Sequence, residues 1–225
     1  MEIKKIISII NIIKKNKYMA YLVGGSSRDF IYGRDFIDVD IATNMPLNEV
    51  SNLFEVVDKQ GECFGSVKIK YAGMVAEITH FRKESYENGN TFPKIKLIDD
   101  IQEDAKRRDF TINCIYLDVS NNMTYDPYDG IKDLYNHTLR FIGDPKTRII
   151  EDPTRIIRGL RIAYKLNLDI DKDTNQGFID NIDELKRLSN SRYKKEIEKM
   201  YEELKDNKTK KILSLYKMED IEDEH

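Results

Sequence analysis

The chain has 225 residues, of which 40% are hydrophobic and 34% are charged. This length can bury the core of one large domain or two small ones, and this composition excludes both a membrane protein and an intrinsically disordered chain. The formal net charge of −3 excludes a globally positive surface for nucleic acid, although a single cleft can still be locally basic.

The first predicted element is an amphipathic helix. Apolar residues at positions 3, 6, 7, 10 and 13 lie on one face of a helix. Lys14 and Lys15 end this apolar run, and no small-residue cleavage site follows, so the run does not fit a secretory signal. We therefore expect a cytoplasmic protein without a membrane partner.

Strands and short helices are predicted between residues 20 and 118. Their order is a strand at 20–23, a helix at 27–32, a strand at 38–42 and a helix at 47–54. A hairpin follows, with strands at 67–71 and 74–81 joined at Ala72-Gly73. After a polar, mobile loop at 85–91, we expect a strand at 95–97, a helix at 101–107 and a last strand at 115–118.

Beyond about residue 130 the pattern becomes helical. Helical periodicity spans residues 153–166, 174–182 and 191–204, and we expect no strand there. The acidic segment 219–225 is expected to fray. The sequence therefore predicts an α+β fold, with a mixed-sheet domain at 1–134 and a small all-helical domain at 135–225.

Two carboxylates stand close together on one predicted strand. Asp38 and Asp40 are two residues apart, so both side chains are expected on the same face. Carboxylates held this close repel each other unless a cation lies between them, and oxygen ligands on a rigid strand suit Mg²⁺. Taken alone, such a pair is more often a solvated strand face.

A glycine-rich turn precedes this pair and changes its interpretation. Gly24 and Gly25 stand at a strand-to-helix turn, where backbone N–H groups can approach a phosphate at a helix N-terminus. Such a turn can also be only a turn. Here only one short helix separates the turn from the paired carboxylates, and this combination predicts metal-dependent phosphate chemistry. Glu77, on a later strand, can supply a third carboxylate.

Ordered sequence blocks resemble those of class II tRNA nucleotidyltransferases, the CCA-adding enzymes, and of bacterial poly(A) polymerases. The resemblance covers residues 21 to about 196. It rests on the segments 24–29, 33–34, 38–43, 77–82, 107–113, 126–134, 151–158 and 188–196, which are GGSSRD, GR, DVDIAT, EITHFR, RRDFTIN, DPYDGIKDL, EDPTRIIR and LSNSRYKKE.

The resemblance implies a polymerase-β-like nucleotidyltransferase head followed by a helical neck, with two Mg²⁺ ions, or Mn²⁺ in their place, bound by Asp38 and Asp40. One ion would activate an RNA 3′-OH and the other would hold the triphosphate of CTP or ATP. The implied residues are Asp38, Asp40 and Glu77 for catalysis; Gly24, Gly25, Arg28 and Arg108 for the triphosphate; Asp109 and Asn113 for the ribose; Asp152, Arg155 and Arg158 for the base; and Glu151 and Arg107 in support.

Base choice without a nucleic acid template requires protein groups that read the base. Asp152 and Arg155 are three residues apart on a predicted helix and are expected to share a face. A carboxylate only accepts hydrogen bonds and a guanidinium only donates them, which suits the amino group and adjacent ring nitrogen of cytosine and adenine. The alternative is that Asp152 only caps the helix that starts at Pro153.

The chain also departs from the family pattern. Ser26 and Ser27 replace small apolar residues, which we expect to be harmless. The segment 84–93 keeps the family's length, which favours addition of A, but Gly89 and Thr91 stand at its usual acidic and basic positions. Family members usually continue into helical body and tail domains, so we expect a short form with head and neck only, and weak, salt-sensitive RNA binding.

The function expected from these features is CCA addition to the 3′ end of tRNA from CTP and ATP. Addition of A alone, or poly(A) synthesis, remains open because the same motifs serve all three reactions. A catalytically silent RNA-binding subunit of a split enzyme is the alternative from another class. A homodimer or a partner subunit is left open as the way in which a short chain holds tRNA.

Overall fold

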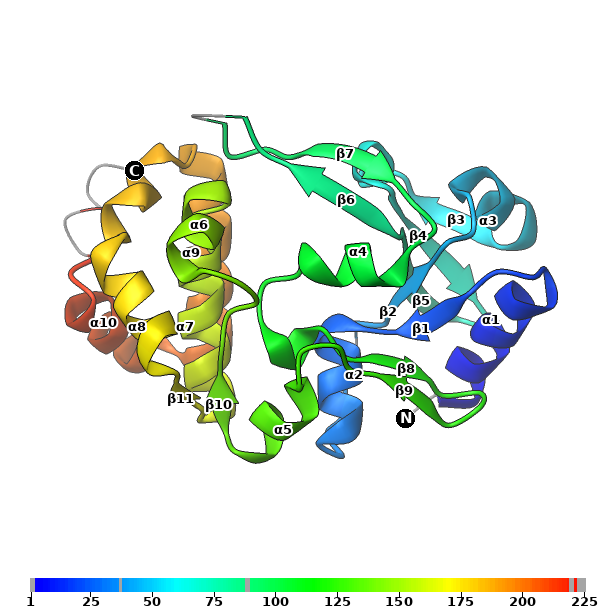
Figure 1. The fold of residues 1–225 in the computed structure, drawn as a ribbon, viewed down its shortest axis with the longest axis horizontal. Helices are drawn as coiled ribbons and strands as arrows, with labels where there is room; N and C mark the ends of the chain where they lie inside the picture. Colours follow the sequence, from blue (N-terminus) through cyan, green and yellow to red (C-terminus); the bar gives the residue numbers. More distant parts are fainter. Residues whose placement is uncertain (1–2, 37, 88–89, 219–220, 222–225) are drawn as a thin grey trace. The chain divides into compact units, whose positions relative to one another are not determined.

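The computed structural model describes residues 3–36, 38–87, 90–218 and 221 (Figure 1). The chain forms two compact units. The first comprises residues 1–85, 94–108 and 112–131, and the second comprises 86–93, 109–111 and 132–225. The predicted domain bounds, 1–134 and 135–225, stay a prediction. The compact units differ from them in that the segments 86–93 and 109–111 belong to the second unit.

The first unit is built on a mixed sheet, as predicted. Its strands run in the order β3-β4-β5-β2-β1-β8-β9, and β2 and β5 are parallel whereas the other neighbours are antiparallel. The strands are β1 (Ala20–Leu22), β2 (Asp40–Thr43), β3 (Glu55–Asp58), β4 (Ser66–Tyr71), β5 (Met74–His80), β8 (Tyr116–Asp118) and β9 (Met123–Tyr125). A separate antiparallel pair consists of β6 (Arg82–Ser85) and β7 (Lys94–Leu97).

Helices of the first unit follow the predicted periodicity. They are α1 (Ile3–Lys15), α2 (Gly24–Ile31), α3 (Leu47–Leu53) and α4 (Ile101–Lys106), with a 3-10 turn at Glu62–Phe64. In α1 the buried side chains are Ile6, Ile9, Ile10 and Ile13, which form the apolar face seen in the sequence and join the core beside the sheet. The helix α5 (Gly130–Tyr135) and a 3-10 turn at Thr111–Asn113 each span a point in the sequence where the chain passes from one unit to the other.

The hairpin between β4 and β5 has the predicted turn. Ala72 and Gly73 have φ angles of 48° and 80°. Two-residue hairpin turns that need positive φ at both positions match the twist of their strands, and alanine is a strained choice for the first position. This hairpin places Glu77 on β5, the strand that pairs with β2.

Two predictions about strands are wrong. Residues 115–118 do not form the last strand, because the chain turns at Asn121 and Asn122 and returns as β9 beside β8. The second unit is also not free of strands, since β10 (Thr138–Leu139) and β11 (Asp169–Ile170) form a short parallel pair. Both missed pairings involve two or three residues, which is too short for a hydrophobic alternation to be recognised.

The second unit is otherwise helical, as predicted. Its helices are α6 (Pro145–Glu151), α7 (Thr154–Leu166), α8 (Lys172–Asp180), α9 (Asn190–Leu204) and α10 (Asp206–Leu215), with a 3-10 segment at Ile182–Arg187. Close packing is visible at Gly159 in α7, where a Cβ would lie 2.5 Å from the Phe178 ring and 2.8 Å from the Phe110 ring. Among the described residues, no helix is long and apolar enough to cross a membrane.

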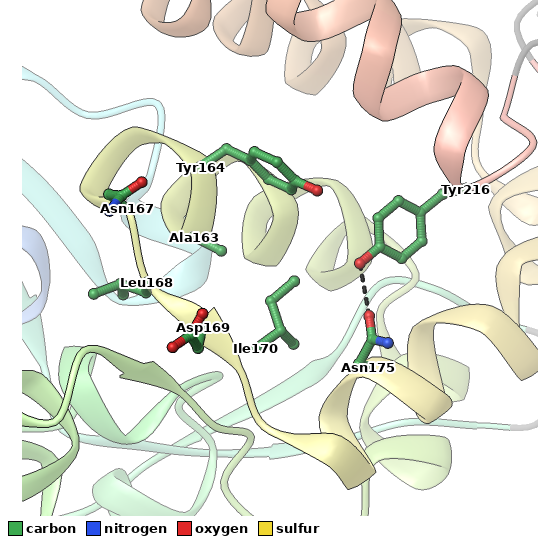
Figure 2. Close-up of a pocket in the computed structure, with 8 residues that line it drawn as sticks. All are labelled: Ala163, Tyr164, Asn167, Leu168, Asp169, Ile170, Asn175 and Tyr216. Carbon is green, nitrogen blue, oxygen red and sulfur yellow. Dashed lines mark hydrogen bonds between the residues drawn. The ribbon is translucent and has the colours of Figure 1, made fainter.

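A cavity of about 350 Å³ lies in the second unit where α7 ends (Figure 2). The Tyr216 hydroxyl donates to Asn175 Oδ1 at 2.6 Å, and burial, followed by the neighbouring Tyr164, raises the pKa of Tyr216 to about 12. None of the predicted site residues lines this cavity. Its lining residues are Ala163, Tyr164, Asn167, Leu168, Asp169, Ile170, Asn175 and Tyr216.

Candidate active site

The glycine-rich turn brings backbone and carboxylate close together at the start of β2. Val23 N–H donates to Asp40 O at 3.0 Å, and the chain then enters α2 at Gly24 with a φ of 71°. A Cβ at Gly24 would lie 3.1 Å from Asp40 Oδ2. Glycine is therefore required at position 24 both by its left-handed backbone and by the space that the Asp40 carboxylate occupies.

Ser26 links this turn to the strand. Its hydroxyl accepts from Asp40 N–H at 2.9 Å and donates to Val23 O at 3.0 Å. Ser26 is 2% exposed and Ser27 is fully buried. Because the Ser26 hydroxyl fixes the backbone of Asp40, this serine contributes to the turn, and a small apolar side chain could not replace these two bonds.

The structure brings Asp40 and Glu77 together. They are register partners on the parallel strands β2 and β5, and Glu77 N–H donates to Val39 O at 2.8 Å. The Ser66 hydroxyl donates to Glu77 Oε1, which fixes that carboxylate from the neighbouring strand. Two carboxylates from adjacent strands thus stand beside the glycine-rich turn.

The prediction that Asp38 lies on the same strand as Asp40 is wrong. Strand β2 begins at Asp40, whose register partner is Glu77 on β5, and its antiparallel pairing with β1 ends at Leu22 opposite Ile41. Asp38 precedes the strand and is exposed. It still lies near enough to Asp40 for its charge to raise the pKa of that carboxyl.

The Asp40 carboxyl has an unusual pKa. Burial raises the pKa of Asp40 to about 6; the charges of Glu77 and Asp38 add to the rise, and those of Arg108 and Arg28 oppose it. A cation would relieve this repulsion. Among the described residues, no three or more Asp, Glu, His or Cys side chains are arranged to hold a metal ion. Carboxylate oxygens such as those of Asp40 and Glu77 suit Mg²⁺, which takes most of its ligands from water and substrate phosphates.

Replacing Asp40 with asparagine is expected to stabilise the metal-free chain at high pH. The folded-state pKa lies above the unfolded value, so the neutral carboxyl is favourable below about pH 4 and this contribution is lost as the pH rises through about 6. In EDTA, Asp40→Asn should raise the free energy of unfolding by about 3 kcal/mol at pH 8 and leave it unchanged near pH 4. Urea titrations would measure this, with Asp58→Asn on β3 as control, and an equal effect at both pH values would contradict the expectation.

Arg28 and Asn113 are also joined in the first unit. Arg28 Nη1 donates to Asn113 Oδ1 at 2.7 Å, and its Nε donates to Asp29 Oδ1 at 2.9 Å. Arg28 and Asn113 are each 7% exposed. A Cβ at Gly25 would lie 3.5 Å from Arg28 Nη2, an ordinary contact, so space alone does not require glycine at position 25.

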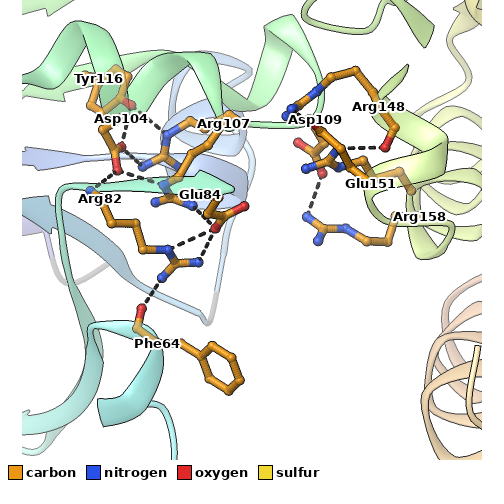
Figure 3. Close-up of polar contacts among 12 residues, drawn as sticks. Phe64, Arg82, Glu84, Asp104, Arg107, Asp109, Tyr116, Arg148, Glu151 and Arg158 are labelled. Atoms are coloured by element: carbon orange, nitrogen blue, oxygen red, sulfur yellow. Dashed lines mark hydrogen bonds and ion pairs between the residues drawn. The ribbon is translucent and has the colours of Figure 1, made fainter. Parts of the chain in front are cut away.

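The buried carboxylate of Asp104, which the sequence analysis missed, contacts Arg107 and Tyr116 (Figure 3) and also holds Arg108. Arg108 Nη2 donates to Asp104 Oδ2 at 3.0 Å, and its Nε donates to the Tyr116 hydroxyl at 2.7 Å. Asp104 also accepts from Arg107 Nε at 2.9 Å, from Arg82 N–H at 3.0 Å and from the Tyr116 hydroxyl at 2.7 Å. The signal available in the sequence was an aspartate three and four residues before two arginines on a predicted helix.

Asp104 is fully buried and ionised. Burial opposes the charge, but the Arg108 and Arg107 guanidinium groups hold the pKa of Asp104 well below its usual range. Arg107 also donates to Glu84 at 3.3 Å, and Glu84 accepts from Arg82 as well. Arg107, predicted as a supporting residue, thus joins α4 to β6.

In the second unit, Glu151 holds Arg155. Arg155 Nη1 donates to Glu151 Oε2 at 2.8 Å and to Arg148 O at 2.7 Å, and Arg155 is only 4% exposed. Arg148 Nη1 donates to the same Glu151 oxygen. Separately, Arg158 Nη2 donates to Asp109 Oδ2 at 2.6 Å (Figure 3). A predicted base-selecting residue therefore pairs with a predicted ribose-binding residue, whereas Asn113 belongs to the other unit.

The prediction that Asp152 and Arg155 share a helix face is wrong. Asp152 has an extended backbone between α6 and α7, and α7 begins at Thr154. Asp152 Oδ1 accepts from Thr154 N–H at 3.1 Å and from its hydroxyl at 2.7 Å, so the aspartate also binds the first residue of this helix. Pro153 separates the two helices because its ring excludes a continuous helix through this point.

The loop positions singled out in the sequence are only partly described. Gly89 lies outside the described residues, as does most of the acidic segment 219–225. Thr91 is 7% exposed, and both its carbonyl and its hydroxyl accept from Arg192. Arg192 was noted only as part of a family block.

Comparison with known proteins identifies relatives of the chain. A model of the poly A polymerase head domain matches residues 20–140. The CCA-adding enzyme of Lactobacillus helveticus (strain DPC 4571) is 36% identical over 197 residues, which are 87% of this chain and 49% of that protein. The chain spans about half the length of the curated relatives it matches.

The chain is also similar in structure to solved proteins of the same kind. The Bacillus stearothermophilus CCA-adding enzyme in complex with CTP has a TM-score of 0.79 and 31% identity, covering 88% of this chain and 48% of that one. A tRNA nucleotidyltransferase complexed with a primer tRNA and an incoming ATP analog has a TM-score of 0.74 and 26% identity, covering 92% of this chain and 60% of that one.

Proposed function

The chain belongs to the family of the poly A polymerase head domain, and from this membership we propose that it adds C and A to the 3′ end of tRNA, using CTP and ATP and releasing pyrophosphate. The observation that carries the proposal is the pair Asp40 and Glu77, in register on parallel strands and beside the left-handed glycine at position 24. The CTP complex and the primer tRNA complex of similar proteins support these substrates.

The proposal assigns Asp38 and Asp40 to Mg²⁺, with Glu77 as the third catalytic carboxylate. When bound, the ions would neutralise the triphosphate and favour the ionised form of the attacking 3′-OH. The protein's own contribution is to hold the reacting groups in position, so no nucleophilic side chain is required. The anion-binding groups proposed for the triphosphate are the Gly24 and Gly25 backbone and the guanidinium groups of Arg28 and Arg108.

Asn113 and Asp109 are proposed to bind ribose hydroxyl groups, and Asp152 and Arg155 to read the base. An Asp152 oxygen would accept from the amino group of cytosine or adenine, and Arg155 would donate to the adjacent ring nitrogen. UTP and GTP place a carbonyl oxygen where CTP and ATP carry the amino group, so the carboxylate would repel it. Arg158 would assist through its ion pair with Asp109, and Glu151 by holding Arg155.

Stepwise incorporation tests the proposal. Purified chain with Mg²⁺ would be offered CTP, ATP or both, on tRNA transcripts that end before CCA, after the first C and after CC. We expect up to three nucleotides to be added, with extension stopping at CCA. Addition of A only to the CC-ended transcript would identify an A-adding enzyme, and unlimited A addition a poly(A) polymerase. No incorporation on any transcript would contradict the proposal and favour a silent RNA-binding subunit.

Three further expectations stay predictions. They are the cytoplasmic location, a homodimer or partner subunit, and the weak, salt-sensitive binding of tRNA. The last is consistent with a formal net charge of −3, which offers tRNA no globally positive surface. A titration of tRNA binding between low and moderate salt would measure it.

A further inference from the structure

One guanidinium in the second unit joins two segments that are far apart in sequence. Arg192 Nη1 donates to Thr91 O at 3.0 Å and to Thr91 Oγ1 at 2.8 Å, and the Arg192 guanidinium carbon lies 4.6 Å from the centre of the Phe92 ring. Its Nη2 donates to Asp152 Oδ1 at 2.9 Å. Arg192 therefore connects the end of the loop 86–93 to the junction of α6 and α7.

Helix stability does not explain an arginine at this position. Arg192 lies in the first turn of α9, three residues after the N-cap Ser189, whose hydroxyl accepts from the Arg192 N–H. A positive charge there is unfavourable with the helix dipole, by a few tenths of a kcal/mol. The guanidinium also makes bidentate, planar contacts that lysine cannot reproduce. Its favourable interactions are those with Thr91, Phe92 and Asp152.

The contacts to Asp152 all fall on one oxygen. Oδ1 receives the Arg192 guanidinium, the Thr154 N–H and the Thr154 hydroxyl, at 2.9, 3.1 and 2.7 Å. Among the described residues none donates to Oδ2. Three donors on Oδ1 fix the rotation of the carboxylate, so that Oδ2 is the oxygen available to a hydrogen-bond donor from outside the protein.

We propose that Arg192 is a positioning residue for base selection, which orients the Asp152 carboxylate and ties its orientation to the loop segment Thr91–Phe92. This inference rests on the proposed function, in which Asp152 accepts from the amino group of the incoming base. With Oδ1 held, the carboxylate presents one acceptor in one direction, which matches an amino group and repels a carbonyl oxygen. Without Arg192, only the Thr154 N–H and hydroxyl still donate to Oδ1, so the carboxylate is held less firmly and the loop end loses its anchor.

The test is the selectivity of Arg192→Lys for CTP over UTP. The ratio of the two kcat/KM values is measured on a tRNA transcript that ends before CCA, and because both values come from one preparation, the ratio does not depend on the folded fraction. We expect selectivity to fall by about tenfold or more, since lysine keeps the charge but cannot bridge Thr91 and Asp152. Loss of packing alone would lower both kcat/KM values equally.

Arg187→Lys is the matched control. Arg187 Nη1 donates to Ile150 O at 3.1 Å, so it reaches the end of α6 near the same junction, and it also pairs with Glu184. Its selectivity should equal that of the unchanged chain. Equal selectivity in Arg192→Lys and the unchanged chain would overturn this inference alone. An unchanged chain that incorporates CMP and UMP equally would overturn base selection by Asp152, and the inference with it.

Discussion

Replacing Asp40 with alanine is expected to lower incorporation of CMP and AMP by about a thousandfold or more, while the chain stays folded. Asp40 is the residue on which the turn at Gly24, the hydroxyl of Ser26 and the register partner Glu77 converge. Its carboxylate lies near the like charges of Glu77 and Asp38, which a bound cation would balance, so its loss would remove a metal ligand and the charge neutralisation that the metal gives to the triphosphate. The measurement is kcat/KM with labelled CTP on the transcript that ends before CCA.

Two comparisons make this result interpretable. Asp58→Ala changes an aspartate on β3 of the same sheet and should leave incorporation unchanged. The double change Asp38→Ala and Asp40→Ala should leave no measurable incorporation. If Asp40→Ala retained activity within tenfold of the unchanged chain in the presence of Mg²⁺, the assignment of the catalytic carboxylates would be refuted.

Periodicity was enough to predict the long elements of the fold. The apolar face of α1, the β4–β5 hairpin and the helices α7 and α9 repeat a pattern over many residues. Strand β9 could not be found this way, because Met123 at its start is 64% exposed and the strand has only three residues. Its existence depends on pairing with β8, which is a tertiary contact.

The site was predicted mainly through ordered motifs, and its geometry was not. A spacing of two residues places Asp38 and Asp40 on one face only while the strand lasts, and the sequence does not reveal where the β1 pairing ends. Pro153 likewise separates Asp152 from the helix that carries Arg155. Ordered motifs therefore supplied the candidate residues, whereas their arrangement depends on partners distant in sequence.

The burial of Asp104 within its arginine network could not be predicted from local sequence either. Asp104 to Arg107 and Arg108 is a local helical spacing, but Tyr116 and the Arg82 backbone come from β8 and β6. Only their convergence makes Asp104 a fully buried carboxylate with four hydrogen-bonding partners rather than an exposed helix residue. Removing the carboxylate charge while the arginine charges stay buried is therefore expected to destabilise the fold.

Asp104→Asn is therefore expected to destabilise the first unit by about 3–5 kcal/mol, since Arg107 and Arg108 would keep buried charges without their carboxylate. The folded-state pKa of Asp104 lies below its unfolded value, so its stabilisation is present above about pH 4 and is lost only as the pH falls further. The loss in free energy of unfolding should thus be the same at pH 6 and pH 8, which urea titrations at both pH values would measure.

Glu103→Gln is the control for this change, because Glu103 is a partly exposed neighbour that pairs with Lys106 and Lys83 at the surface of the same helix, where a pair contributes little. A loss below about 1 kcal/mol for Asp104→Asn would contradict the role of the buried carboxylate.

Because Asp104 also directs the Arg108 guanidinium, the variant that remains folded at low temperature should have a higher KM for CTP at each pH. A destabilised variant with an unchanged KM would separate the two roles, leaving Asp104 as a residue of the fold and removing Arg108 from the triphosphate site.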